Sequence, residues 1–197
     1  MDEVSRLSLG KEVLNMSDPN FNVLLYSDGS LHSFSAAVYT ARLMQNMPYM
    51  HLTVVQVQEH VIGSEYRWID TWPISPNSAW MKKILEEADE ETKREYSDIL
   101  KQTQAVFLKK GLEINYQMLI AKATISETAD AIIDYAVKNS FNLIIMGTRG
   151  LTDLKGLIFG SVAHTMLNRS PIPVLLIKKL PQELIDTYER AAGIGNG

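Results

Sequence analysis

The sequence predicts an α/β fold, in which a five-stranded, mostly parallel sheet is doubly wound with helices in a Rossmann-like manner. Short apolar runs recur along the chain without strict alternation, as in strands that are buried on both faces. Segments with apolar residues at helical spacing separate these runs. The resulting order is strand–helix four times and then a final strand, which with right-handed crossovers gives a doubly wound sheet.

Composition narrows the class of protein. The chain has 197 residues, of which 46% are hydrophobic and 21% charged, and this suits one domain with its own core. The chain has no cysteine, and this excludes disulfides, iron–sulfur centres, thiolate zinc sites and a cysteine nucleophile. A net charge of −4 without a long basic run argues against nucleic acid as a partner. The sequence has neither a signal-peptide block nor an 18-residue apolar run, so we expect a soluble, cytoplasmic protein with no membrane partner.

The strands are predicted from the apolar runs. A fifth run, at residues 114–120, alternates more than the others. The four continuous runs are residues 23–26, 52–57, 143–146 and 174–177.

The first two helices follow the first two strands. Leu31, Phe34 and Val38 recur at three to four residues after the turn at residues 28–30, and they predict a helix there. A longer segment, about 79–110, has apolar residues near helical spacing among abundant Glu and Lys. Gly111 is placed to end that helix.

The last two helices of the repeat are marked by their ends. Thr124 and Glu127 form a capping box, which opens a helix with apolar residues on one face. The final crossover helix should start near Ser161 and finish before Pro171.

Some segments lie outside the repeat. The predicted domain covers 21–180, preceded by a polar N-terminal arm at 1–20. A long connection at 58–78 contains two tryptophans and two prolines, and could cover a sheet edge or form a partner surface. The C-terminal tail, 181–197, could hold a short helix over 181–192 before a glycine-rich, disordered end.

One glycine-rich segment follows a buried strand and opens a helix. Gly147 and Gly150 are followed, nine residues later, by Gly160 and Ser161. Glycines let backbone amides approach a ligand, and the amides at Ser161 and Val162 would be the open donors of a helix N-terminus, a natural seat for phosphate. The alternative is a glycine-rich turn with a serine N-cap.

Other polar residues end neighbouring strands. Ligands in open α/β sheets bind beyond the carboxyl ends of the strands, where the strand order reverses. Ser27 and Asp28 end the first strand and Val57 the second, so they can converge with Gly147. Asp28 could accept a hydrogen bond from an adenine amino group or a ribose hydroxyl. Alternatively, it only forms a turn that caps the first helix.

These motifs resemble the universal stress proteins over roughly residues 21–178. The resemblance rests on VLLYSDGS at 23–30, NLIIMGTRG at 142–150, GSVAHTML at 160–167 and SPIPVLLIK at 170–178. It implies the adenine nucleotide alpha hydrolase-like fold and the family's ATP-binding pattern. By this resemblance, adenine and ribose would be held at Ser27, Asp28 and Val57. The phosphates and ribose would be held at Gly147, Arg149, Gly150, Gly160, Ser161, Val162 and Ala163.

The resemblance also implies a function. It indicates an ATP-binding module, with or without Mg²⁺, that regulates an unidentified protein partner in a stress response. No general base is evident near the phosphate donors, which favours a regulator over an enzyme. A slow ATP hydrolase and a nucleotide-free dimerisation module are the alternatives. The four histidines show no metal-ligand spacing, so no protein metal site is expected.

The final strand predicts a homodimer. The apolar run at 173–177 lies near the end of the chain and should form a sheet edge, which invites pairing with a second copy. Members of the family that this chain resembles dimerise through this strand. The alternative is that the helix at 181–192 folds back and covers the edge.

Overall fold

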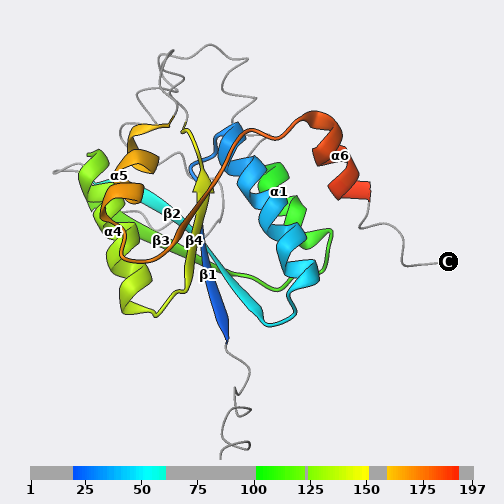
Figure 1. Ribbon diagram of the computed structural model, residues 1–197, viewed down its shortest axis with the longest axis horizontal. Helices are drawn as coiled ribbons and strands as arrows, with labels where there is room; N and C mark the ends of the chain where they lie inside the picture. Colours follow the sequence, from blue (N-terminus) through cyan, green and yellow to red (C-terminus); the bar gives the residue numbers. More distant parts are fainter. Residues whose placement is uncertain (1–19, 61–100, 123, 151–158, 191–197) are drawn as a thin grey trace, which may run out of the picture.

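The computed structural model describes residues 20–60, 101–122, 124–150 and 159–190, and in these residues it forms one parallel sheet with the strand order β3-β2-β1-β4-β5 (Figure 1). All four neighbouring strand pairs are parallel, which confirms the predicted α/β fold. The strands are β1 (Phe21–Tyr26), β2 (Met50–His60), β3 (Asn115–Lys122), β4 (Leu143–Gly147) and β5 (Val174–Ile177).

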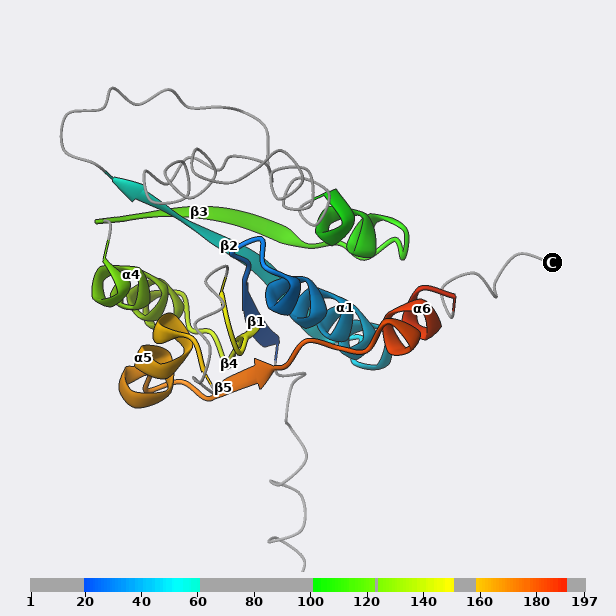
Figure 2. The same ribbon diagram turned by 90° about the horizontal axis from the view of Figure 1, so that it is seen from above.

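Helices lie on both faces of the sheet (Figure 2). On one face are α4 (Ile125–Lys138) and α5 (Ser161–Arg169). On the other are α1 (Leu31–Asn46), a helix described over 101–108, and α6 (Gln182–Arg190). Among the described residues, none of these helices combines the length and the apolar character that a bilayer span requires.

The central strand β1 contributes side chains to two separate cores. Val23 and Leu25 belong to the cluster under α1, whereas Leu24 and Tyr26 belong to the cluster under α4 and α5. Because successive side chains of a strand point to opposite faces, both faces of β1 are buried and its apolar run is continuous.

Local signals in the sequence set several helix ends. The Thr124 hydroxyl accepts a hydrogen bond from Glu127 N at 3.2 Å, as the capping box predicts. Gly111 has a φ of +60°, and Leu112 N donates to Phe107 O at 3.2 Å, which ends the 101–108 helix. Both predicted ends are confirmed.

The predicted connection at 58–78 begins too early. Gln58, Glu59 and His60 belong to β2, because they pair with residues 120–122 of β3. Sequence alone cannot show this, since the partner strand is what extends β2 through polar residues. The rest of the predicted connection, the first part of the 79–110 helix, most of the N-terminal arm and the glycine-rich end lie outside the described residues.

The predicted terminal helix exists as α6, and it packs against α1. Ile185 is buried in the same cluster as Phe34, and Lys110 Nζ donates to the carbonyl oxygen of Tyr188 at 2.7 Å. Figure 2 shows α6 beside α1, beyond the end of β5, and not along that strand. In the described part of the chain, β5 pairs only with β4, so its outer side is a sheet edge.

Candidate functional site

The strand order reverses between β1 and β4. The chain passes from β1 to β2 on one side, and β4 later pairs with β1 on the other side. The last residues paired between them are Tyr26 and Met146, so both strands end at the same edge of the sheet. The segments that begin at Ser27 and Gly147 therefore leave the sheet side by side, at the position where open α/β sheets bind ligands.

The turn after β1 is built by Asp28. Its Oδ1 accepts a hydrogen bond from Ser30 N at 3.0 Å, across Gly29, whose φ of +80° favours glycine. The Ser30 hydroxyl then accepts from Ser33 N at 3.1 Å and caps α1. The turn-and-cap interpretation of Asp28 is therefore confirmed. It leaves room for a second role, because only Oδ1 accepts from Ser30.

Three hydrogen bonds hold the segment after β4 in place. The Ser30 hydroxyl donates to Arg149 O at 3.2 Å, which joins this segment to the first turn of α1. Thr148 N donates to Ile177 O at 2.9 Å, and Thr148 O accepts from Gly160 N at 2.8 Å. Thr148, which is 4% exposed, thus links the ends of β4 and β5 to the start of α5.

At Gly147 and Gly150, an added Cβ would come too close to other atoms of the protein. A Cβ at Gly147 would lie 2.7 Å from the carbonyl carbon of His32 and 2.8 Å from Ser33 N. One at Gly150 would lie 2.9 Å from Asp28 Oδ2. The sequence-based explanation, that glycine leaves room for a ligand, is thus incomplete, because Gly147 is first required for close packing against the backbone of α1.

The start of α5 corrects another expectation. Its N-cap is Gly160, with no side-chain cap, so the predicted alternative of a serine N-cap is wrong. The first backbone bond of the helix runs from His164 N to Gly160 O at 2.9 Å. The amides of Ser161, Val162 and Ala163 precede that bond and are the open donors of the helix. A Cβ at Gly160 would lie 3.2 Å from Arg149 Cα, so these amides start close to the 148–150 segment.

Ser27 is a buried polar residue without a complete set of partners. It is 2% exposed, and its backbone N donates to Val55 O at 2.9 Å. Its hydroxyl has no hydrogen-bond partner among the residues that the structure describes. Burying a hydroxyl in this way costs free energy unless a partner is supplied. Val57 lies two residues beyond Val55 on β2 and is partly buried.

The structure therefore brings most of the predicted residues together at one edge of the sheet. Ser27 and Asp28 meet the 147–150 segment, and that segment meets the start of α5. Val57 lies on the adjoining strand. Ser30 and Thr148, which link these segments, were not predicted as site residues. The signal for Thr148 was a polar residue directly after a strand end, and the signal for Ser30 was a serine at the end of the turn that precedes α1.

These features define a class of protein. It is an α/β domain with a five-stranded parallel sheet, in which glycines and open backbone amides lie beyond the carboxyl ends of the strands, where the strand order reverses. Residues 20–178 match the universal stress protein family, and the chain belongs to that family. The resemblance seen in the sequence is thereby confirmed.

Individual relatives agree. Universal stress protein MJ0531 of Methanocaldococcus jannaschii is 33% identical over 91 residues, which cover 46% of this chain and 51% of that protein. Universal stress protein YxiE of Bacillus subtilis is 26% identical over 152 residues, 77% of this chain and 93% of that protein.

Solved structures share the fold. UspA from Lactobacillus plantarum gives a TM-score of 0.52 at 19% identity, over 80% of this chain and 97% of that chain. A universal stress protein crystallised in complex with cAMP gives a TM-score of 0.53 at 18% identity, over 81% of this chain and 97% of that chain.

Proposed function

We propose that the chain binds ATP at the edge formed by β1, β4 and the start of α5, and acts as a nucleotide-dependent regulatory module in a stress response. The observation that carries the proposal is the combination of the open amides at the start of α5 with the buried hydroxyl of Ser27, neither of which has a side-chain partner among the residues that the structure describes. The amides suit phosphate oxygens, and the hydroxyl requires a polar partner that a bound ligand would supply.

The two ends of the ligand would meet different chemistry. Phosphates would lie at the start of α5, with Gly147, Arg149, Gly150 and Gly160 keeping the backbone close. Adenine and ribose would lie toward Ser27, Asp28 and Val57. The universal stress protein of the same fold that was crystallised with cAMP supports an adenine nucleotide as the ligand class.

Mg²⁺ would arrive with the nucleotide. Among the residues described, no three His, Cys, Asp or Glu side chains are grouped as a metal site requires. Mg²⁺ commonly binds through substrate phosphates and water, with few protein ligands, so ATP itself would supply most of its coordination.

The decisive experiment is to denature purified full-length protein and separate the released small molecules by chromatography. We expect ATP or ADP in near-stoichiometric amounts, or micromolar binding of added ATP by calorimetry. Protein that neither carries adenine nucleotide nor binds it would favour the nucleotide-free dimerisation module.

Asp28 gives a graded prediction. Asp28→Ala should weaken ATP binding by about 1–3 kcal/mol, through lost polar contacts of the carboxylate. Asp28→Asn is the matched control, since its amide oxygen can still accept from Ser30 N and keep the turn intact. Isothermal titration should rank wild type above Asn, and Asn above Ala. Unchanged affinity in the alanine variant would remove Asp28 from the site.

We expect ATP turnover to be far below the enzymatic median of about 10 per second. The reason is that Asp28, whose Oδ2 would lie 2.9 Å from a Cβ at Gly150, would be engaged at the adenine and ribose end, away from the γ-phosphate. Steady-state phosphate release with ATP and Mg²⁺ measures this directly. A rate near the median would make the protein an ATP hydrolase instead.

We also propose a homodimer built on the outer edge of β5. Residues 173–177 are apolar, and their outer side is unpaired in the described part of the chain. Light scattering at micromolar concentration should give about twice 22.2 kDa. Leu175→Lys should give monomers, while Leu108→Lys, at a position 66% exposed on the 101–108 helix, should not. A wild-type monomer, or a dimer that survives Leu175→Lys, would contradict this interface.

A further inference from the structure

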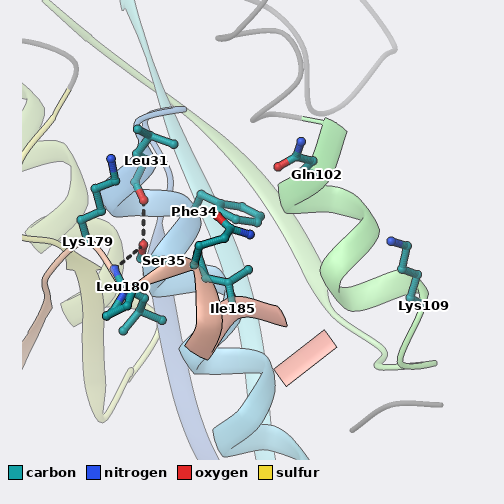
Figure 3. Close-up of a pocket in the computed structure, with 10 residues that line it drawn as sticks. Leu31, Phe34, Ser35, Gln102, Lys109, Lys179, Leu180 and Ile185 are labelled. Atoms are coloured by element: carbon teal, nitrogen blue, oxygen red, sulfur yellow. Dashed lines mark hydrogen bonds between the residues drawn. The ribbon is translucent and has the colours of Figure 1, made fainter. Parts of the chain in front are cut away.

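A cavity of about 770 Å³, half open to solvent, lies between α1, the 101–108 helix and the segment from Lys179 into α6 (Figure 3). Its volume is within the range of small-molecule binding sites. Its apolar surface comes from Leu31 and Phe34 of α1 and from Leu180 and Ile185 of the C-terminal segment. Phe34 and Ile185 are also part of the core, at 5% and 7% exposure, so this surface is held by the packing of the domain.

Among the described residues that line the cavity, the charged groups are all positive. These groups are Lys109 and Lys179, and none of the ten described lining residues is acidic, although the chain as a whole has a net charge of −4. Figure 3 shows the two lysines on opposite sides, with Phe34, Leu180 and Ile185 between them. Within the described ranges, neither ammonium forms an ion pair with a carboxylate.

The buried hydroxyl of Ser35 holds the segment before α6 against α1. Ser35 Oγ donates to Leu31 O at 2.9 Å and accepts from Leu180 N at 3.0 Å, as the dashed lines of Figure 3 mark. Further along, Lys110 Nζ donates to Tyr188 O at 2.7 Å. The C-terminal segment is therefore fixed against α1 at its start and against the turn after the 101–108 helix near its end, and the cavity has built walls on either side.

The cavity does not belong to the family domain alone. Five of its ten described lining residues follow residue 178, where the family match ends: Lys179, Leu180, Pro181, Gln182 and Ile185. It also shares no residue with the proposed nucleotide site. Its ligand must therefore be inferred from its own chemistry.

We propose that this cavity binds an anionic amphiphile of the medium-chain carboxylate class. The hydrocarbon chain would cover Leu31 and Leu180, the partly exposed leucines of the lining, where apolar contact replaces water. The carboxylate would reach Lys109 or Lys179, each an exposed point charge that can donate a hydrogen bond. A cationic amphiphile would find no acidic partner among the described lining residues, and a small anion would leave the apolar surface wet.

The test is calorimetric titration of full-length protein with dodecanoate below its micelle concentration. We expect saturable one-to-one binding, about fourfold weaker for each methylene removed from the chain, down to hexanoate. Dodecyltrimethylammonium should bind at least tenfold more weakly than dodecanoate. Reversing both charges, with Lys109→Glu and Lys179→Glu, should lower the affinity for dodecanoate at least tenfold. Lys178→Glu is the matched control, because this exposed neighbour does not line the cavity, and it should change little.

The location is checked by amide chemical-shift changes, which should concentrate at residues 179–185 and near Lys109. Circular dichroism reports whether the double variant stays folded, and the spectrum is expected to be unchanged. No step of this test uses ATP, so this inference and the proposed function fail independently. Absence of saturable binding, equal affinity for the cationic amphiphile, or an unaffected double variant would each overturn the proposal.

Discussion

Gly160→Val is expected to abolish ATP retention while the domain stays folded. A Cβ there would already lie 3.2 Å from Arg149 Cα and 3.3 Å from Gly150 N, and the two further carbons of valine would push α5 away from the 148–150 segment. That shift stretches the bond from Gly160 N to Thr148 O, now 2.8 Å, and displaces the amides of residues 161–163. The φ of Gly160 is −68°, which any residue adopts, so the backbone itself tolerates the change.

The loss should be at least about a hundredfold in affinity, as expected when several backbone donors are misplaced together. Nucleotide released from purified protein and calorimetry with added ATP both measure it. Gly160→Ala is the graded control, and its affinity for ATP should fall between those of the wild type and the valine variant. Circular dichroism should show the valine variant folded. A valine variant that binds ATP as wild type does would place the phosphates elsewhere.

Gly147→Ala is expected to lower the free energy of unfolding by about 3 kcal/mol. Its Cβ would lie 2.7–2.8 Å from backbone and Cβ atoms of His32 and Ser33, in the first turn of α1, and backbone atoms cannot move aside as a flexible side chain can. Overpacking of a dense interior typically costs about 1–3 kcal/mol, and backbone contact belongs at the upper end. Urea unfolding followed by circular dichroism measures the change.

Gly111→Ala is the informative comparison. A Cβ at Gly111 would meet nothing within 4 Å, but its φ of +60° disfavours any other residue. We expect a cost of about 1–2 kcal/mol from backbone conformation alone. If the two alanine variants lose equal stability, close packing against α1 does not explain glycine at Gly147.

The sheet could be predicted because burial leaves a pattern in the sequence. The four residues of β1 from Val23 to Tyr26 face two cores in turn, so the run is apolar throughout. β3 lies at the edge of the sheet, where Ile120 is 46% exposed, and its sequence alternates accordingly. The full length of β2 could not be predicted, since Gln58 to His60 are strand only through their pairing with β3.

The candidate site was predictable as a set of residues and not as a set of contacts. Glycine spacing and strand ends indicated which segments would meet. The roles depend on pairs distant in sequence, such as the Ser30 hydroxyl with Arg149 O, 119 residues apart, and the Gly147 backbone against His32. No local pattern encodes those distances, so the packing role of Gly147 and the bare N-cap at Gly160 emerged only in three dimensions.

The position of β1 in the middle of the sheet also bears on how the chain is made. Asn22 N donates to Asn142 Oδ1 at 2.8 Å across 120 residues, at the start of the β1–β4 pair. During synthesis, β2 follows β1 closely, whereas β4 is translated much later. Until then one side of the central strand has no native partner, and an unpaired strand edge in a nascent chain is prone to aggregation. The candidate site, which lies where β1 and β4 end, is therefore among the last parts of the domain to be completed on the ribosome.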